Sequence, residues 1–493
     1  MIAWIIGHVV ADCVERKYDQ DSFVCVCNAN QCDVVEPIYN IGTNMAAIYT
    51  TSKDEDRLTK SAELFGTQRV GSLRARIFPN KKFQKIVGFG GAITDAAMIV
   101  LDKLRKSQKD SNDCKICKQL TNQYYGPNGI SYTLGRVNLG SLCLNSNTTK
   151  LLFFAKLIEK SNGNLKLFAS PWSAPAWMKT SGQMKGGGEL KGEPNGIYYL
   201  TFARYFIRFF EEYHKEGVDF WGLTLINEPG AGKQPDYRWQ AMYISPDQQR
   251  EFVDNRLGPM LRKHWLTKDI KIMAHDDQRD NLFEWAKSYY KNPDTLIDGL
   301  GVHWYSQSSY DTLEKTHNLR PDKFILPTEA CNAYLPNEQE PLLGSWYYAE
   351  RYAQDIINNL LNYAAGWTDW NIWLNEFGGP NWVGNFVDSP IIVNITGQEF
   401  YKQPMYYVIG HFSKFILPDS ERIQIKVDGF EGKETDDLQA VAFSTPNGYN
   451  VVVLHNRNSL ITYNLALGVG EQPSSFVPLH LKPKSIQTVI LKS

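Results

Sequence analysis

The sequence predicts an α/β protein built on a (β/α)8 TIM barrel, with an associated β-sandwich domain and a small disulfide-bearing β region at the N-terminus. Three observations predict this architecture. Strand-like and helix-like runs alternate eight times between residues 83 and 371, which is the size and rhythm of such a barrel. From about residue 421, short strands separated by turn signals are typical of a sandwich. Four cysteines crowd into residues 13–32.

Composition excludes several classes of protein before any motif is considered. The chain has 493 residues, of which 43% are hydrophobic, and 52 basic residues balance 53 acidic ones to a net charge of −1. This is globular composition, and it lacks the basic footprint of a nucleic-acid-binding protein. No apolar run reaches the roughly 18 residues that a membrane span needs, so we expect a soluble or peripheral protein. The 13 Trp and 26 Tyr suit a large core or a sugar-binding cleft equally well.

The N-terminal segment carries signs of the secretory route. Residues 1–12 begin with an apolar run and end near Ala11, as a short or truncated signal peptide does, although the basic n-region is missing. A buried first strand is the alternative. The cluster Cys13, Cys25, Cys27 and Cys32 predicts two disulfides, because no His lies nearby and paired C-x-x-C units for zinc are absent.

Other secretory signals are weaker. Asn147 and Asn394 begin N-x-Thr triplets and are candidate glycosylation sites. Cys114 and Cys117 form a lone C-x-x-C in a polar, helix-like stretch, which we interpret as a surface pair without redox function, because the βαβ context of a redox motif is missing.

Within the barrel segment, eight strands are predicted. They cover residues 83–89, 132–139, 165–169, 220–226, 270–274, 297–305, 323–327 and 366–370. The clearest helix spans 197–213, where five aromatic residues recur on one helical face. A doubly wound sheet is the alternative fold, but the glycines of residues 88–91 do not have the G-x-G-x-x-G spacing that it would favour.

The domain boundaries follow from these runs. Strands at 422–427, 438–443, 449–454, 463–467 and 485–491 predict the sandwich, and the strand-like residues 37–82 complete it. We therefore expect a sandwich of 37–82 plus 421–493, a barrel of 83–371 plus 404–420, and a small β region of 13–36 plus about 372–403.

Two carboxylates follow predicted barrel strands, where barrel enzymes carry their reactive groups. Glu228 follows the fourth strand within Asn227-Glu228-Pro229, and Glu329 follows the seventh. Such a pair is what a retaining glycoside hydrolase needs, one as acid/base and the other as nucleophile. Arg136 and Tyr305, also at strand ends, are expected to keep the nucleophile's pKa low.

Each of these residues also has a purely structural interpretation. An isolated Glu at a strand end is more often a solvated rim residue, and His303 is more often a core histidine. Arg136 could be an ion-pair partner inside the barrel. No Ser-His-Asp motif, phosphate-binding loop or metal-ligand spacing competes for the site.

Long blocks of the chain resemble the glucosylceramidases of glycoside hydrolase family 30. The resemblance runs from Cys13 to the end and rests on blocks 23–33 (FVCVCNANQCD), 88–96 (GFGGAITDA), 170–180 (SPWSAPAWMKT), 227–229, 302–305 (VHWY), 329–331, 366–371 (GWTDWN), 378–394 (GGPNWVGNFVDSPIIVN) and 400–415. It implies disulfides Cys13–Cys25 and Cys27–Cys32.

The same resemblance implies a function and a site. It implies hydrolysis of glucosylceramide with retention, Glu228 as acid/base and Glu329 as nucleophile, without a metal or organic cofactor. It further implies that Asn227 contacts the 2-hydroxyl, that Arg136 and Tyr305 orient the nucleophile, and that the glucose pocket is lined by Trp172, Trp370 and Asn385. The implied location is the lysosome, at its lumenal membrane surface, with anionic lipid and a saposin-like activator protein as partners. Protonation of nine His near pH 5 would turn the net charge positive and favour such a surface.

The chain departs from the family after the second strand. Cys143 stands about where the family has an aspartate that binds outer glucose hydroxyls, and some thirty residues of loop are missing before Trp172. Two alternatives therefore stay open: a family 30 hydrolase acting on another β-glycoside, such as a β-xyloside or β-1,6-glucan, or a catalytically weakened glycolipid-binding homologue. Retention of both carboxylates favours an enzyme.

Overall fold

A computed structural model describes residues 12–493 except 39–40, 68–70, 72, 112, 141–155, 157–158, 162, 164, 307–309, 339 and 429–436. The predicted signal peptide up to residue 11, Cys143 and the candidate glycosylation site Asn147 lie outside the described residues.

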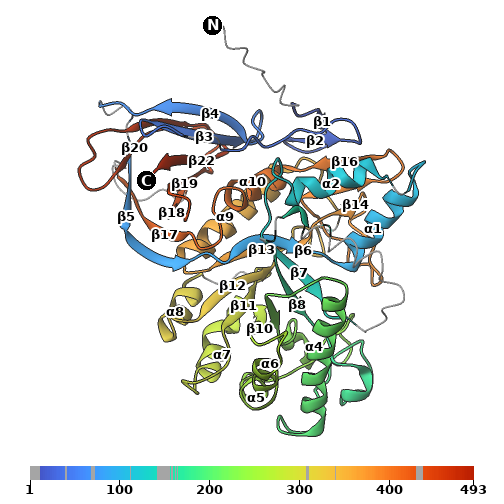
Figure 1. Ribbon diagram of the computed structural model, residues 1–493. Coiled ribbons are helices and arrows are strands. Elements are labelled where there is room, and N and C mark those ends of the chain that lie inside the picture. The colour runs from blue at the N-terminus through green and yellow to red at the C-terminus, as the bar shows by residue number, and fades with distance from the viewer. Residues whose placement is uncertain are drawn as a thin grey trace.

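A barrel of eight parallel strands forms the centre of the molecule (Figure 1). In chain order its strands are β6 (Gly88–Ala92), β7 (Leu134–Asn138), β8 (Lys166–Ser170), β9 (Gly222–Thr224), β10 (Lys271–Gln278), β11 (Gly299–His303), β12 (Phe324–Glu329) and β13 (Gly366–Asn371). Neighbours in the chain are neighbours in the sheet, and β13 pairs with β6. A bridge between Ile325 and Ala364 joins the two remaining edges. The predicted barrel is confirmed.

The first barrel strand differs from the prediction of 83–89. The structure ends one strand of the sandwich, β5 (Leu73–Lys85), and starts β6 only at Gly88. Phe83, Ile86, Val87 and Phe89 fall within one strand-like run, so the sequence does not reveal that the chain changes sheets at Ile86 and Val87. Gly90 then allows β6 to approach β7 closely, because a Cβ there would lie 1.9 Å from the Leu134 carbonyl oxygen.

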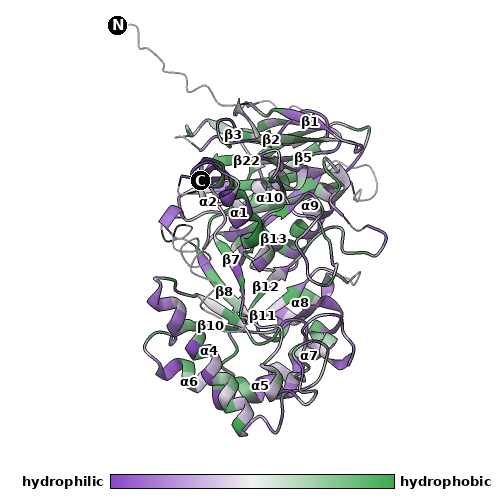
Figure 2. Ribbon diagram, turned by 90° about the vertical axis from the view of Figure 1, so that its right-hand side faces the viewer, coloured by the Kyte–Doolittle hydropathy of each residue, from purple (hydrophilic) through white to green (hydrophobic). Residues whose placement is uncertain are grey.

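Helices surround the barrel strands. They are α1 (Asp95–Lys106), α2 (Lys115–Tyr125), α4 (Ile197–Lys215), α5 (Pro246–Phe252), α6 (Gly258–Lys263), α7 (Leu282–Tyr289), α8 (Asp311–Leu319), α9 (Trp346–Leu361) and α10 (Pro404–Ser413). The predicted aromatic face of α4 is buried. Figure 2 shows hydrophobic residues along the barrel strands and α10, whereas the outer helices mix both kinds of residue.

The sandwich is formed by strands from both ends of the chain, which lie side by side in Figure 1. Its nine strands are β3 (Met45–Ser52), β4 (Thr59–Leu64), β5, β17 (Glu421–Asp428), β18 (Leu438–Ser444), β19 (Tyr449–Asn456), β20 (Tyr463–Val469), β21 (Val477–Leu481) and β22 (Ser485–Lys492), in the sheet order β21-β20-β5-β17-β18-β19-β22-β3-β4. A bridge between Gly66 and Phe476 brings the two edges of this sheet together, so it curls over itself. Strand β21 was not predicted.

A small five-stranded sheet combines β1 (Glu15–Lys17) and β2 (Phe23–Cys27) with β14 (Leu374–Asn375), β15 (Ile391–Asn394) and β16 (Glu399–Lys402). Disulfides join Cys13 to Cys25 and Cys27 to Cys32, the pairings that the resemblance implies. Asn394 ends β15, and its Nδ2 donates to the Tyr401 hydroxyl at 3.1 Å; its glycosylation remains a prediction.

The interpretation of Cys114 and Cys117 as a surface pair was wrong. Cys114 and Cys117 form a third disulfide, and Cys114 is buried. The Cys114 Sγ also caps α2 by accepting the Cys117 N–H at 3.2 Å. The bond closes the first turn of a helix that packs on the barrel, which a polar sequence context does not reveal.

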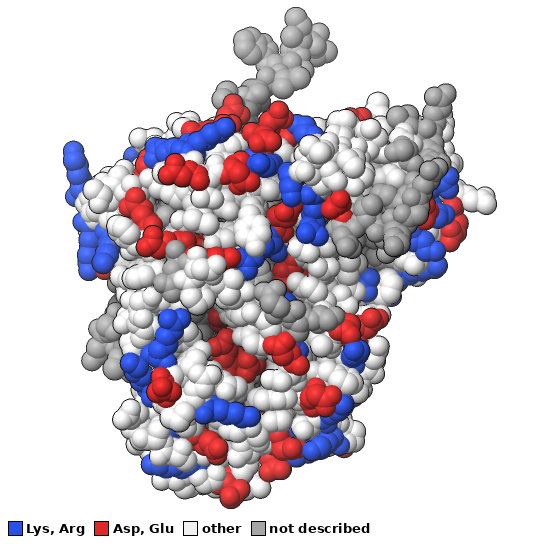
Figure 3. Space-filling model, turned by 180° about the vertical axis from the view of Figure 1, so that it is seen from behind, with Lys and Arg blue, Asp and Glu red and all other residues white. Residues whose placement is uncertain are grey.

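Charge and hydropathy agree with the composition. Figure 3 shows basic and acidic side chains intermixed on the face it displays. Among the described helices, none combines the length and apolar character that crossing a membrane requires.

Candidate active site

A cavity of about 880 Å³ opens at the carboxyl ends of the barrel strands. Most of the predicted site residues line it: Trp172, Asn227, Glu228, Tyr305, Glu329, Trp370 and Asn385. Arg136 is fully buried beneath it. The structure therefore brings together side chains that are spread over about 250 positions of the chain, as strand ends in a barrel do.

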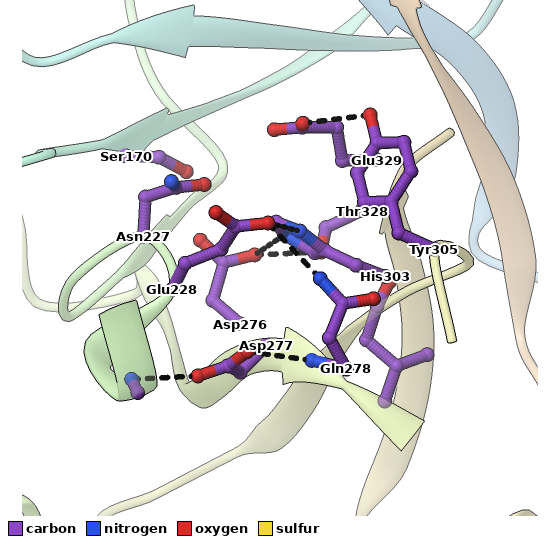
Figure 4. A network of polar contacts seen from close by, with 12 residues as sticks. Ser170, Asn227, Glu228, Asp276, Asp277, Gln278, His303, Tyr305, Thr328 and Glu329 are labelled. Atoms are coloured by element: carbon purple, nitrogen blue, oxygen red, sulfur yellow. Dashed lines mark hydrogen bonds and ion pairs between the residues drawn. The ribbon is translucent and has the colours of Figure 1, made fainter. Parts of the chain in front are cut away.

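Glu228 is held in a left-handed backbone conformation with φ of 43°. Its N–H donates to the Asp276 carbonyl oxygen at 2.9 Å, and Pro229 starts a short 3-10 turn directly after it. Its carboxylate meets Gln278 Nε2 at 3.0 Å and His303 Nδ1 at 3.2 Å (Figure 4). The other oxygen, Oε2, accepts from the Tyr237 hydroxyl at 3.5 Å, and both residues line the cavity.

Glu329 is the last residue of β12 and is only 7% exposed. The Tyr305 hydroxyl donates to Oε1 at 2.9 Å, and Arg136 Nη1 donates to Oε2 (Figure 4 draws the contact with Tyr305). Burial raises the pKa of Glu329, and the charges of His303 and Arg136 oppose that shift. The expectation of a low pKa for this carboxyl was thus wrong in direction, because its desolvation outweighs its cationic neighbours.

Arg136 joins four groups at the floor of the site. Besides Glu329, it contacts Asn227 Oδ1 and Asp276 Oδ2, both at 2.8 Å from Nη2, and Ser170 Oγ at 3.1 Å from Nε. Burial lowers its pKa, but Asp276 and Glu329 raise it more, so the guanidinium stays charged. The contacts expected of Arg136 as an ion-pair partner inside the barrel and those expected of it as a residue that orients Glu329 are therefore the same contacts.

Asp276 and His303 connect the two carboxylates from below. His303 lies between Glu228 and Asp276, with Nε2 3.1 Å from Asp276 Oδ1. Although burial alone would lower it, Glu329, Asp276 and Glu228 raise the pKa of His303 to about 10. His303 is thus a buried histidine whose two ring nitrogens both have partners, as the structural interpretation expects, and one of these partners is the Glu228 carboxylate. Arg136 and His303 hold the pKa of Asp276 well below its usual range, despite its burial.

A bulge in β10 makes this arrangement possible. The pairing of β10 with β11 shifts register between His275 and Asp277, and His275 and Asp276 have φ of 71° and 52°. Because side chains alternate along a strand, the bulge re-aims consecutive carboxylates. Asp276 points into the floor, and Asp277 accepts the N–H groups of Gly230 and Gln278, each at 2.8 Å.

Aromatic rings form one wall of the cavity. Trp172 and Trp370 lie with ring centroids 5.4 Å apart, and the Arg136 guanidinium lies 5.0 and 5.5 Å from their centres. Asn385 lies on the rim, where its Oδ1 accepts from Arg238 at 2.7 Å. Its amide oxygen is therefore engaged by the loop after β9 rather than open to the cavity.

The carboxylates are close enough for direct attack on a sugar held between them. One oxygen of Glu228, one oxygen of Glu329 and a ring nitrogen of His303 all lie within 4.8 Å of one another. Retaining glycosidases need a separation of about 5–5.5 Å, whereas inverting ones need about 6.5–9.5 Å for a water molecule. The same three groups are near enough to share a metal ion, but a protonated His303 has no lone pair for one.

Asp276, Asp277 and Gln278 were missed by the sequence analysis. The predicted strand stopped at Ala274, and the polar residues after it resembled a loop. The strand-end argument that selected Glu228 and Glu329 would also have selected these residues had the strand been extended to Gln278.

Comparison with known proteins agrees with this geometry. Residues 144–416 match the glycosyl hydrolase family 30 TIM-barrel domain, and residues 419–489 match the family 30 β-sandwich domain. The chain is 38% identical to putative glucosylceramidase 4 of Caenorhabditis elegans over 97% of this chain and 94% of that protein. It is 37% identical to lysosomal acid glucosylceramidase of Mus musculus over 93% and 91%. The solved structure of SrfJ from Salmonella typhimurium, 25% identical, covers 91% of this chain and 100% of its own with a TM-score of 0.77. The chain therefore belongs to glycosyl hydrolase family 30 and is a glycoside hydrolase.

Proposed function

We propose that this chain is a retaining β-glucosidase that hydrolyses glucosylceramide to glucose and ceramide, with Glu228 as acid/base and Glu329 as nucleophile. The approach of the two carboxylates to within 4.8 Å carries the proposal. Their different surroundings support the division of roles. Glu329 is held by two donors aimed at its two oxygens, whereas Gln278 and His303 both meet Oε1 of Glu228 and leave Oε2 to a long contact of 3.5 Å with the Tyr237 hydroxyl.

The first step is a displacement at the anomeric carbon. A carboxylate oxygen of Glu329 attacks that carbon, the bond to the aglycone oxygen breaks, and Glu228 transfers its proton to the departing oxygen. Arg136 and Tyr305 fix the orientation of the attacking carboxylate. The product of this step is a covalent glucosyl ester on Glu329 and free ceramide.

The second step reverses the roles. Glu228, now ionised, removes a proton from a water molecule, whose oxygen attacks the anomeric carbon and displaces Glu329. Asn227 is expected to contact the 2-hydroxyl. Because its Oδ1 already accepts from Arg136, its Nδ2 is the group left for the sugar. Trp172 and Trp370 offer apolar ring surfaces for the C–H groups of glucose.

The substrate and location are inferred from the relatives named glucosylceramidase and lysosomal acid glucosylceramidase. We infer a lysosomal enzyme that works peripherally at an anionic lumenal membrane surface, with a saposin-like activator as a further partner. Fewer than nine histidines add charge at this pH, because burial lowers the pKa of His275 to about 4 and of His411 and His455 to about 3. These histidines stay neutral near pH 5, so the gain of positive charge is smaller than nine His would give. Vesicle binding tests this part: equal binding with and without anionic lipid at both about pH 5 and about pH 7 would contradict it.

The catalytic proposal is tested by trapping the intermediate. A 2-deoxy-2-fluoro β-glucoside with a good leaving group should add one fluoroglucosyl group to the protein, and peptide mapping should place it on Glu329. Glu329→Gln should abolish both labelling and turnover of a fluorogenic β-glucoside near pH 5, whereas Glu216→Gln, on the exposed end of α4, should change neither.

Three outcomes would contradict the proposal. They are a label on another residue, an inverted first product by NMR, or absence of turnover in the folded protein. Turnover of β-xylosides or β-1,6-glucan in preference to glucosides would instead leave the mechanism in place and replace the substrate. Glucosylceramide itself, presented with anionic lipid, is the substrate to assay next.

A further inference from the structure

Asn138 ends strand β7 and points into the catalytic cavity. It lies two residues after Arg136 on the same strand, and side chains two apart on a strand share a face. Arg136 is fully buried inside the barrel, so this face is the inner one. The Asn138 side chain lines the cavity together with Trp172, Glu228 and Glu329.

The amide oxygen of Asn138 has no partner in the described part of the chain. Its Oδ1 is buried, yet among the residues that the structure describes no donor reaches it. A buried amide oxygen without a partner costs about 1–3 kcal/mol, and such groups in native structures have a specific explanation. A side-chain amide offers both donors and acceptors, and a half-turn of the amide, which exchanges its oxygen and its nitrogen, brings either of them to the cavity for a sugar hydroxyl. Arg136 and Asn227, its neighbours on the cavity floor, are by contrast bonded to each other.

The order of the barrel strands shows which part of a sugar Asn138 can reach. Glu228 follows β9 and Glu329 ends β12, and the shorter arc between them, β10 and β11, is filled by Asp276, His303 and Tyr305. A glucose ring bound at both carboxylates must therefore extend over the longer arc, β8, β7, β6 and β13. Asn138 lies on that arc, between the strands that carry Trp172 and Trp370.

We propose that Asn138 is a substrate-binding residue that hydrogen-bonds the glucose hydroxyls remote from the scissile bond, and that it thereby contributes to the choice of sugar. The proposal rests on the proposed β-glucosidase function. The hydroxyls in question are those on C3, C4 and C6, because C1 and C2 lie at the carboxylates and at Asn227. Asn138 is a binding residue here and takes no part in bond breaking.

A cycle of substrate and protein variants tests this contact. Values of kcat/KM are measured for aryl β-glucosides and their 3-, 4- and 6-deoxy analogues, with the native chain and with Asn138→Ala. The variant should lose about three- to tenfold on the full glucoside, the equivalent of one neutral hydrogen bond. For at least one deoxy analogue, removal of the hydroxyl should lower kcat/KM less in Asn138→Ala than in the native chain, by a similar factor. The reason is that the variant has already lost the side chain that binds this hydroxyl.

The outcomes separate the contact from a loss of fold and from the mechanism. Asn195→Ala, an exposed asparagine before α4, is the matched control and should leave every ratio unchanged. If Asn138→Ala fails to fold, Asn138→Ser carries the same cycle with a shorter hydrogen-bonding group. If removal of each hydroxyl lowers kcat/KM equally in the native chain and in Asn138→Ala, the role of Asn138 is overturned. Labelling of Glu329 would in that case still support the mechanism. No turnover and no labelling in the native chain would instead overturn the proposed function.

Discussion

Removing the Tyr305 hydroxyl is the sharpest single perturbation of this site. It donates to Glu329 Oε1 at 2.9 Å and lies 3.4 Å from Cys331 Sγ. The Tyr305 ring packs against Tyr334, with centroids 4.9 Å apart. Tyr305→Phe keeps this ring and removes only the donor, so the packing of the wall should persist.

The size of the effect follows from the contact that is lost. A hydrogen bond to a charged group contributes about 1.5–3 kcal/mol, and about 1.36 kcal/mol corresponds to a factor of ten. The expected loss in kcat/KM is therefore about 10- to 150-fold. The hydroxyl stabilises the charged form of Glu329, so its removal should raise the pKa of this carboxyl further. The acid limb of the pH profile should therefore move to higher pH.

The assay is kcat/KM for a fluorogenic β-glucoside from about pH 4 to pH 8, with Tyr305→Phe beside the native chain. Tyr347→Phe, an exposed tyrosine on α9, is the matched control. A loss below about threefold together with an unmoved acid limb would refute the reasoning, because it would mean that Arg136 alone holds the carboxylate. A large loss without any shift would refute only its electrostatic part.

Three further variants probe the acid/base side and the buried carboxyls. Glu228→Ala should slow aryl glucosides with poor leaving groups far more than a dinitrophenyl glucoside, since only the former need the proton; equal losses would contradict the role. Asp277, whose pKa burial and Glu228 raise to about 6, repels the Glu228 carboxylate, so Asp277→Asn should move the alkaline limb to lower pH, and an unmoved limb would speak against it. Burial raises the pKa of Asp388 to about 7, so its ionisation opposes folding and stability is gained as pH falls through 7. Between pH 7 and pH 5 this gain is about 2 kcal/mol, and Asp388→Asn should lose it in denaturant titrations at both pH values; an unchanged difference would count against the assignment.

The barrel and its two carboxylates could be predicted because they depend on local pattern and on one geometric rule. Each strand was marked by an apolar run, and a parallel barrel brings all strand ends to one mouth. Glu228 and Glu329 could therefore be paired although they lie about one hundred residues apart in the chain. The disulfide pairings and the glucose contacts came from the family resemblance, since spacing alone leaves them open.

The rest of the site depends on features without a local signature. The bulge at His275 and Asp276 places polar residues inside the barrel where the pattern indicates a loop. The pKa direction of Glu329 depends on a balance between desolvation and two buried cations, which only three-dimensional distances decide. Strand β21 was missed although its residues alternate between buried and more exposed, and it contains Pro478, a residue that suits only an edge strand.

The place of β22 in the sandwich has a consequence for how the chain acquires its fold. This strand lies between β19 and β3 and pairs with β3 over seven residues, whereas on the far side β4 meets β21 through the bridge between Gly66 and Phe476. During synthesis, the apolar side chains of β3 must wait for more than four hundred further residues before this partner emerges. Until then β3 presents an unpaired edge, which is a site for wrong pairing between chains. Substitutions that weaken β22 should therefore reduce the yield of soluble protein more than they reduce the activity of the molecules that do fold.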